Sequence, residues 1–567
     1  MLVFAAFLSM ASLAVDWPVL DKDTRLVYDS VFTPRAVAVP PRNAPGGLMV
    51  TGDGILRCFG VQKYGERPLD VTLESRDLGL NWTLRPRQKG EGVFLKCPWA
   101  DYSLDSYASI PGVTTYGKLR ALPLRRRWIF AFYRPSEGQK FCHPALVYSD
   151  DDGKTWSPRV DVTNALSVAE MRPPDKSHRW NIGCSEPDLI ELKDGSVLMM
   201  ARTGTDHHAF YRSSDGGLTW EGPQEWPAFW ASNTMPFLMR LSDGRILAIW
   251  NNTQILPRFD AAEYPELRPS EIDGTWEYVF TNRDALHAAI SEDEGKTWIG
   301  FREIALNDIR NRADYREFAE GEWKGGCDKS VHQEDAIELP GGKIVVIYGQ
   351  NVASRKLALF DVKWLYEKGR ADDLRCGLGN FSTQLYVKSL LGNGRGWSGH
   401  CAMNRVPGAA MVREPDTVRD TKRECLQICR IRDERLVDDR QGVVWNFPAA
   451  KKGKVSFECR IDGAGVRVSL CDHWINPCDD AIASRAPFSV PLNAGALGGA
   501  GKWTTISFAW DLDAATVTVK CDGREKVLPL HTDGFSPFGL SYLHLQTLAK
   551  EHDPKGAYFR WFKMKGE

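Results

Sequence analysis

The chain has 567 residues, of which 43% are hydrophobic and 26% charged, and its formal net charge is -1. This length exceeds what one hydrophobic core normally supports, so we expect at least two domains of ordinary globular composition. A near-neutral chain without a basic stripe lacks the electrostatic footprint of a nucleic-acid-binding protein, and we expect no such partner.

The first 14 residues are apolar and uncharged, and they end in the small residues Ser12-Leu13-Ala14. This pattern is typical of a secretory signal peptide, although the usual basic residue at its front is missing. We therefore expect a signal peptide at 1–14 and a secreted or periplasmic protein. A start further upstream or a short buried strand is the alternative. No later stretch is long enough to cross a bilayer, so we expect no membrane span.

An eight-residue pattern, Ser-x-Asp-x-Gly-x-Thr-Trp, occurs four times, with Asn in the Thr place of the first copy. The copies are Ser75–Trp82, Ser149–Trp156, Ser213–Trp220 and Ser291–Trp298. Ser and Asp side chains bond nearby backbone N–H groups, Gly accepts a positive φ, and Trp buries a large ring. The pattern predicts a hairpin turn repeated once per sheet. A calcium loop or active site would not need four near-identical copies.

A second signal consists of Gly-containing turns between apolar runs, which are typical of β-hairpins. These turns are Thr51–Gly54, Lys193–Gly195, Ser242–Gly244 and Pro340–Gly342. Together the two signals predict four-stranded blades. We expect blades at about 35–83, 116–157, 181–221 and 233–299, a fifth from about 332, and a sixth combining 26–32 with chain after 361.

The eight-residue repeats resemble the Asp-box, or BNR repeat, of the sialidase (neuraminidase) superfamily, whose fold is a six-bladed β-propeller. The resemblance covers about the first two thirds of the chain and implies such a propeller over 15–380. Later runs alternate apolar and polar residues, which predicts an antiparallel β-sandwich. Gly501-Lys502-Trp503 resembles the start of a strand in a laminin-G or concanavalin-like jelly roll. We expect an all-β chain, with a linker and this sandwich at 381–567, serving as a brace or a sugar-binding module.

The resemblance also implies site residues facing a central channel. Glu186 opens one predicted strand and Arg202 ends the next, as in sialidases. Glu186 would then be the base partner of a nucleophile, and Arg202 would bind a substrate carboxylate through its planar guanidinium. Arg35, in a degraded form of the family's Arg-Ile-Pro motif, and Asp70, by position only, would be a carboxylate-binding arginine and the acid/base group.

The chain departs from the family where the nucleophilic Tyr is expected, because Gln333 occupies that position. His332, Glu334 and Asp335 surround it and could supply a base or a carboxylate nucleophile. A polar channel lining is the alternative interpretation. Tyrosines that could act from elsewhere are Tyr315 and Tyr348.

Four further residues are predicted around the same mouth as substrate-binding groups: His207, His208, Asn233 and Asn251. Adjacent side chains of a strand point to opposite faces, so His207 and His208 would share a metal only from a loop. The cysteines show no zinc spacing. We expect neither a metal nor another cofactor.

The leading hypothesis is an exported, sialidase-like exo-glycoside hydrolase that removes a terminal acidic sugar from a glycan, with sialic acid as the family default. A carbohydrate-binding propeller without turnover is the second hypothesis, because it would keep the arginines and lack the nucleophile. A glycosidase of the same fold with a non-sialic substrate is a further alternative. The linkage, the disulfides and the oligomeric state stay open.

Overall fold

The computed structural model describes residues 35–38, 49–50, 55–59, 71–77, 81–86, 93–97, 100–104, 117–135, 142–162, 183–203, 205–232, 234–254, 283–306, 331–332, 334–349, 356–375, 377–383, 409–415, 423–432 and 441–567. The predicted signal peptide lies outside these ranges. The regular structure of the described residues is almost entirely strand, which confirms the expected all-β class. Among the described residues, no helix has the length and apolar composition needed to cross a membrane.

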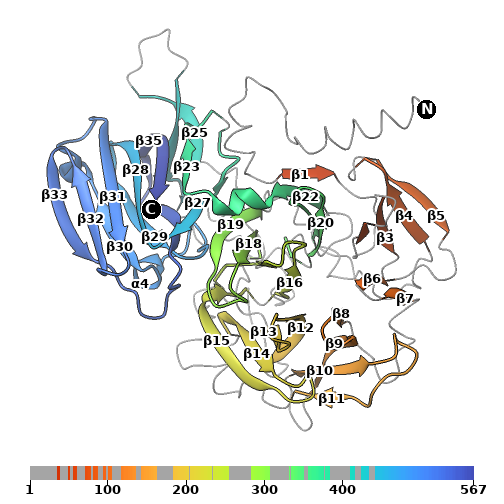
Figure 1. Cartoon of the computed structure of the whole chain (residues 1–567). Helices are drawn as coiled ribbons and strands as arrows, with labels where there is room; N and C mark the ends of the chain where they lie inside the picture. Colours follow the sequence, from red (N-terminus) through yellow and green to blue (C-terminus); the bar gives the residue numbers. More distant parts are fainter. Residues whose placement is uncertain are drawn as a thin grey trace, which may run out of the picture.

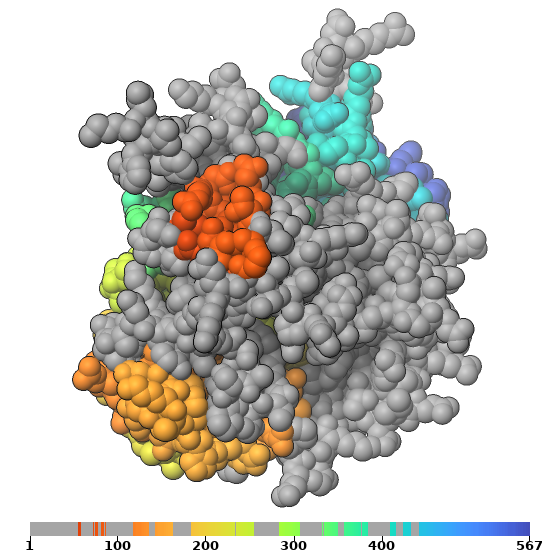
Figure 2. Space-filling view, turned by 90° about the vertical axis from the view of Figure 1, so that its right-hand side faces the viewer, coloured from red at the N-terminus to blue at the C-terminus, as the bar shows by residue number. Residues whose placement is uncertain are grey.

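The first part of the described chain forms four-stranded antiparallel sheets arranged about a common centre (Figure 1). One sheet holds β2 (Met49–Val50), β3 (Leu56–Phe59), β4 (Val71–Ser75) and β5 (Thr83–Pro86). The next holds β8 (Lys118–Leu122), β9 (Arg127–Pro135), β10 (Cys142–Ser149) and β11 (Val160–Asp161). In the side view of Figure 2 the residues of β3–β5 (red-orange) lie above those of the β8–β11 sheet (orange).

Two more sheets follow the same order. One holds β12 (Cys184–Glu191), β13 (Val197–Thr203), β14 (His207–Ser213) and β15 (Glu221–Trp230). The other holds β16 (Phe237–Arg240), β17 (Ile246–Trp250), β18 (Ala285–Ser291) and β19 (Ile299–Leu306). Apolar side chains from neighbouring sheets, such as Leu146 and Val197, pack together, so the core of this part lies between the sheets.

The last sheet is closed by a strand from the beginning of the chain. It contains β20 (Asp335–Leu339), β21 (Lys343–Tyr348) and β22 (Lys356–Asp361), with β1 (Arg35–Ala38) antiparallel to β22. The expectation that Arg35 opens the first blade is therefore wrong. A short run such as β1 carries no local sign of its partner, and here that partner lies more than 300 residues away.

The number of blades stays a prediction. The described ranges contain five four-stranded sheets of this kind and a two-stranded pair, β6 (Val93–Cys97) with β7 (Ala100–Leu104). Figure 1 shows this pair between β3–β5 and β8–β10.

The repeated eight-residue pattern folds as the predicted turn. In the fourth copy Asp293 Oδ1 accepts the backbone N–H of Thr297 at 2.8 Å, and Oδ2 accepts the Thr297 hydroxyl at 2.7 Å. Ser291 Oγ accepts the N–H of Gly295 at 2.8 Å, and this Gly has φ +81°. The ring N–H of buried Trp298 donates to the Gly295 carbonyl at 3.1 Å. The pattern is thus a self-contained staple, and the structural interpretation is confirmed.

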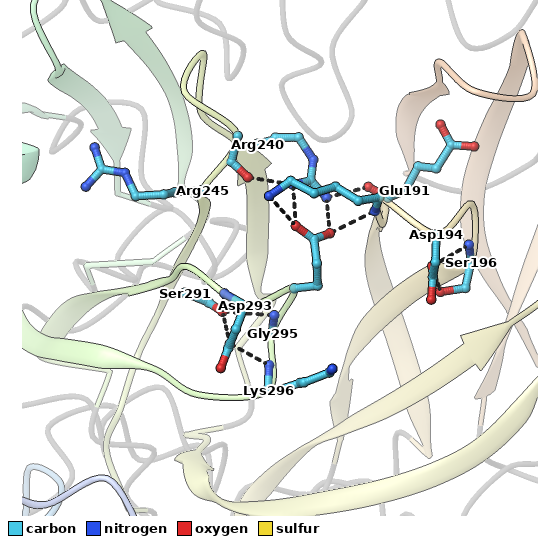
Figure 3. A network of polar contacts seen from close by, with 12 residues as sticks. Glu191, Asp194, Ser196, Arg240, Arg245, Ser291, Asp293, Gly295 and Lys296 are labelled. Carbon is cyan, nitrogen blue, oxygen red and sulfur yellow. Dashed lines mark hydrogen bonds and ion pairs between the residues drawn. The ribbon is translucent and has the colours of Figure 1, made fainter.

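The same turns also join neighbouring sheets (Figure 3). Glu294, inside the fourth copy, accepts from Arg240 Nη2 at 2.8 Å and from the backbone N–H of Lys193 at 2.9 Å. Lys193 belongs to the turn between β12 and β13, so one carboxylate connects the sheet of β12–β15 to that of β16–β19. In the same way, Arg127 bonds Asp150 within its own sheet and the carbonyl of Gly216 in the next.

The second part of the chain is a two-sheet sandwich. The larger sheet contains β23 (Gly369–Asp372), β25 (Ala409–Arg413), β26 (Glu424–Arg430), β28 (Lys452–Ile461), β31 (Thr504–Asp511), β32 (Thr516–Cys521), β33 (Arg524–Pro529) and β35 (Asp553–Gly566). The smaller contains β24 (Phe381–Ser382), β27 (Gly442–Ala450), β29 (Val466–Cys471), β30 (Phe488–Leu492) and β34 (Leu540–Thr547).

Helical structure in the described residues is limited to short segments: η7 (Val362–Tyr366), α4 (Ile482–Arg485) and η9 (Ala494–Leu497). Aromatic and aliphatic side chains such as Trp445, Phe457 and Phe562 fill the space between the two sheets of the sandwich. The expected boundary at 380/381 falls between β23 and β24, both of which pair with sandwich strands.

The sandwich is joined to the sheets of β12–β19 by buried polar groups. Tyr542 Oη donates to Glu303 Oε2 at 2.9 Å, and the N–H of Glu303 donates to Asn446 Oδ1 at 3.0 Å. The N–H of Trp474 donates to the Asn252 carbonyl at 2.9 Å. Because buried polar groups need partners, these bonds fix how the two parts dock.

We expect Glu294→Ala to lower the free energy of unfolding by about 1–3 kcal/mol, because it removes charged hydrogen bonds between two sheets. The change is measured by denaturant unfolding. Glu525→Ala is the control, since the Lys520–Glu525 ion pair has both side chains at least half exposed and should contribute less than about 1 kcal/mol. Equal effects of the two substitutions would contradict a bridging role for Glu294.

Candidate functional site

A buried carboxylate joins the first strands of three sheets. Asp188 on β12 is fully buried, and its oxygens bind Arg120 on β8 through two bonds, Nε at 2.7 Å and Nη2 at 2.8 Å. Lys118 Nζ donates to Oδ2 at 3.1 Å, and the N–H of Leu238 on β16 donates at 2.9 Å. Figure 1 shows β8, β12 and β16 on the inner side of the ring. Asp188 therefore holds this inner side together.

The pKa of Asp188 reflects two opposing effects. Burial would raise the pKa, but the charges of Arg120 and Lys118 and the hydrogen bonds it accepts hold it below the usual value. The carboxylate is therefore ionised at neutral pH. Lys118 also donates to the Pro236 carbonyl at 2.6 Å, so the ammonium group is held from two sides.

Glu186 and Arg202, the pair predicted from the sequence, meet in the structure. Arg202 Nη1 donates to Glu186 Oε2 at 2.7 Å, and both side chains are at most 15% exposed. Ser185 pairs with Arg202 across β12 and β13, and the register shifts between Ser185 and Asp188. Within this irregularity Glu186 has φ +43°, a conformation that is unfavourable for a residue with a Cβ. The irregular backbone lets Glu186 and Asp188 serve different partners.

Glu334, just before β20, is a buried carboxyl group of a different kind. It is 1% exposed, and neither carboxyl oxygen has a hydrogen-bond partner among the described residues. The pKa of Glu334 is raised to about 8, chiefly by burial; the charge of Lys118 opposes this shift, and the charges of Asp188 and Glu186 add to it. At neutral pH Glu334 is a protonated acid.

The other residues of the predicted blade-five cluster, His332 and Asp335, form hydrogen bonds with the nearby backbone. His332 is buried, and its carbonyl accepts the N–H of Gly349 at 2.8 Å. Asp335 Oδ1 accepts the N–H of Ala336 at 2.9 Å at the start of β20. Tyr348, one of the tyrosines considered as a nucleophile, is buried in the hydrophobic core beside Ile344. Of this cluster, Glu334 is the group with unused hydrogen-bonding capacity.

The two predicted histidines face different surroundings, as strand alternation requires. His208 is fully buried, and its Nδ1 lies 3.2 Å from the Ala201 carbonyl. Burial lowers the pKa of His208 to about 3, so it stays neutral. His207 is half-buried and packs against Trp230, with 4.2 Å between ring centroids. Within the described residues, no group of three acidic, His or Cys side chains could hold a metal.

Asn251 is buried and ties the backbone together. Its Nδ2 donates to the Ala285 carbonyl at 2.6 Å and to the Val331 carbonyl at 3.0 Å, while its Oδ1 has no partner among the described atoms. Asp70, Asn233, Gln333 and Tyr315 lie outside the described residues, as does the side chain of Arg35.

Sequence reasoning missed Lys118, Arg120 and Asp188. The signal available was weak: Lys118 and Arg120 alternate on one face of a strand, and Asp188 follows Glu186 by two residues. It also missed Cys142, a half-buried thiol. Burial raises the pKa of Cys142, while the charge of Arg202 lowers this pKa and that of Glu186 raises it.

Residues 59–315 match the family model described as a BNR repeat-like domain. No curated protein sequence matches the chain significantly. Among solved structures, a sialidase is 13% identical at TM-score 0.25, with 94% of this chain and 51% of that chain covered, so this chain spans about half its length.

Two further structural matches are similarly distant. A Trypanosoma rangeli sialidase in complex with sialic acid is 11% identical at TM-score 0.26, covering 92% and 91% of the two chains. An exo-beta-1,3-galactanase from Phanerochaete chrysosporium is 8% identical at TM-score 0.28, covering 94% and 99%. At these TM-scores the matches establish no activity for this chain.

We expect Asp188→Asn to lower the free energy of unfolding by about 3–5 kcal/mol, because it leaves Lys118 and Arg120 without their buried counter-charge. The difference in unfolding free energy between wild type and variant should have its full size above about pH 4 and shrink at lower pH. A lowered pKa in the folded state adds stability only at pH values where the carboxyl group of the unfolded chain is ionised. Denaturant titrations between pH 3 and 7 measure this. Asp522→Asn, at a half-exposed ion pair, should change stability little. An equally small effect at Asp188 would contradict its role as a clamp, meaning the buried charge that holds β8, β12 and β16 together.

Proposed function

We propose that this chain, whose residues 59–315 match a BNR repeat-like domain, is an exo-glycoside hydrolase that removes a terminal acidic sugar from a glycan. Sialic acid is the family default for that sugar. The observation that carries the proposal is Glu334, a buried acid whose oxygens have no partner among the described residues and whose pKa is raised in part by the ion-paired carboxylate of Glu186. Two carboxyl groups in different protonation states are what glycoside hydrolysis requires.

In the proposed reaction Glu334 donates its proton to the glycosidic oxygen as the bond to the anomeric carbon breaks. Glu186 takes a proton from the water that adds to that carbon, so the products are the free sugar and the shortened glycan. Both carboxyl groups then exchange protons with solvent. Arg202 holds Glu186 in place. Together with Lys118 and Arg120, it supplies the positive charge for an anionic sugar.

A carbohydrate-binding protein without turnover is the second candidate. It is favoured by Gln333 at the position where the family's nucleophilic Tyr is expected and by the burial of Tyr348 in the core. Export, through the predicted signal peptide at 1–14, is part of either proposal, and the partner in both is a glycan or glycoconjugate.

We expect Glu334→Gln to lower kcat/KM by about 10²- to 10⁴-fold, because Gln fills the same space without a transferable proton. Release of 4-methylumbelliferone from a sialoside and from a panel of uronides and neutral glycosides measures this. Wild-type activity should fall above about pH 8, where Glu334 loses its proton. Glu338→Gln is the control: Glu338 lies near the end of β20 and bonds Ser242, so this variant should keep wild-type rates within about twofold.

If wild type cleaves no glycoside of the panel, yet binds glycans and loses that binding in Arg202→Ala, the second candidate replaces the first. Activity that survives in Glu334→Gln with an unchanged pH profile would instead remove Glu334 from the mechanism and leave hydrolysis standing.

We also expect Glu334→Gln to change how stability depends on pH. Between about pH 4.5 and 8 the unfolded wild-type chain ionises at Glu334 while the folded chain keeps the proton, so wild type loses stability as pH rises, by about 1.4 kcal/mol per unit at most. The variant lacks this loss and should become relatively more stable from pH 5 to 8. Parallel urea titrations at both pH values test it; a constant difference would mean that Glu334 is not protonated when folded.

A further inference from the structure

A column of three aromatic rings connects the sheet of β12–β15 to the sandwich. His207, at the start of β14, packs on Trp230, at the end of β15, with centroids 4.2 Å apart. Trp230 also stacks on His473 of the sandwich, with 3.8 Å between ring centroids and an interplanar angle of 18°. Trp230 and His473 are buried, whereas His207 is half-buried. The ring of His207 therefore rests on a support that the sandwich completes.

A single carboxylate fixes this support. Asp472 Oδ1 lies 2.6 Å from His473 Nδ1, while Oδ2 accepts the Trp230 indole N–H at 3.1 Å and the backbone N–H of Ser536 at 2.7 Å. Burial would raise the pKa of Asp472, but His473 and these hydrogen bonds hold it below the usual value. Because a buried charge tolerates little displacement from its partners, the two rings are held in one arrangement.

The column stands at the end of the sheet that carries Glu186 and Arg202. In the antiparallel sheet of β12–β15, the start of β12, the end of β13, the start of β14 and the end of β15 lie together. The sandwich packs against this end: the N–H of Gln254 donates to the Trp474 carbonyl at 3.2 Å, and Gln254 Oε1 lies 3.3 Å from His473 Nε2. Figure 1 shows the sandwich on the side of β15, β18 and β19.

We propose that Asp472 and His473 are positioning residues of the site: through Trp230 they hold His207 where it contacts the bound sugar, so that docking of the sandwich sets substrate affinity. The contact of His207 with the sugar rests on the proposed function; the support of His207 by the sandwich does not. Aromatic stacking of this kind contributes about 0.5–1.5 kcal/mol beyond burial, which corresponds to a change in affinity of up to about tenfold.

The test uses the full-length chain with His473→Gln, which removes the ring but keeps an amide that can bond Asp472. We expect KM to rise about 3- to 10-fold with kcat within about twofold, because the catalytic carboxyl groups are untouched. Trp230→Phe, which keeps a ring in the column, should recover most of the affinity lost in Trp230→Ala. Tyr542→Phe is the matched control: it removes the buried bond to Glu303 at the same domain boundary and should lower stability without raising KM.

A second readout does not depend on activity. We expect diethyl pyrocarbonate to modify His207 several-fold faster in His473→Gln than in wild type or Tyr542→Phe, measured by mass spectrometry of the peptide that contains it. Equal rates would overturn the proposal, as would a KM in His473→Gln no higher than in Tyr542→Phe. If wild type cleaves no glycoside, the proposed hydrolysis fails, while the modification rates still decide whether the sandwich supports His207.

Discussion

The buried charge of Asp188 is the constraint on which the inner end of the propeller depends. A carboxylate removed from water must find compensation for the loss of its hydration, and Asp188 finds it on two other strands, through Arg120 and Lys118 of β8 and the N–H of Leu238 on β16. The strands that supply these groups must therefore converge. Glu334 lies on none of these strands, but the negative charge of Asp188 helps to keep the proton on Glu334. The charge of Asp188 therefore has two effects: it holds strands of three sheets together, and it contributes to the raised pKa of Glu334.

The two ends of each sheet have different tasks. The Asp-box turn of Ser213–Trp220 joins the end of β14 to the start of β15, at the same end as the turn near Gly195. This end is held by short local bonds that depend little on the rest of the fold. Glu186 and Arg202 lie at the opposite end. A scaffold stapled at one end leaves the other free to carry irregular backbone, such as the positive φ of Glu186, and the polar groups of a site.

What could be predicted from the sequence follows the same division. The Asp-box and hairpin turns are local, so residue type alone specifies them, and the register of one hairpin is enough to bring Glu186 to Arg202. The pairing of β1 with the last sheet and of Lys118 with Asp188 is non-local, and no periodicity links these partners. The docking of Tyr542 on Glu303 is of the same kind, because each residue alone reads as an ordinary core or strand position.

A comparison of two buried carboxyl groups shows why Glu334, more than any other residue, points to function. Burial raises the pKa of Glu191 as well as that of Glu334. Glu191, however, stands at the stapled end of its sheet and accepts the N–H of Leu124 at 2.7 Å, so its burial contributes to a connection between sheets. Neither oxygen of Glu334 has such a partner among the described residues. A group that weakens the fold at neutral pH and makes no compensating bond is explained by a ligand that supplies the missing partner. A carboxyl group whose pKa is raised by burial therefore has a structural task at one end of the propeller and, in our proposal, a chemical one at the other.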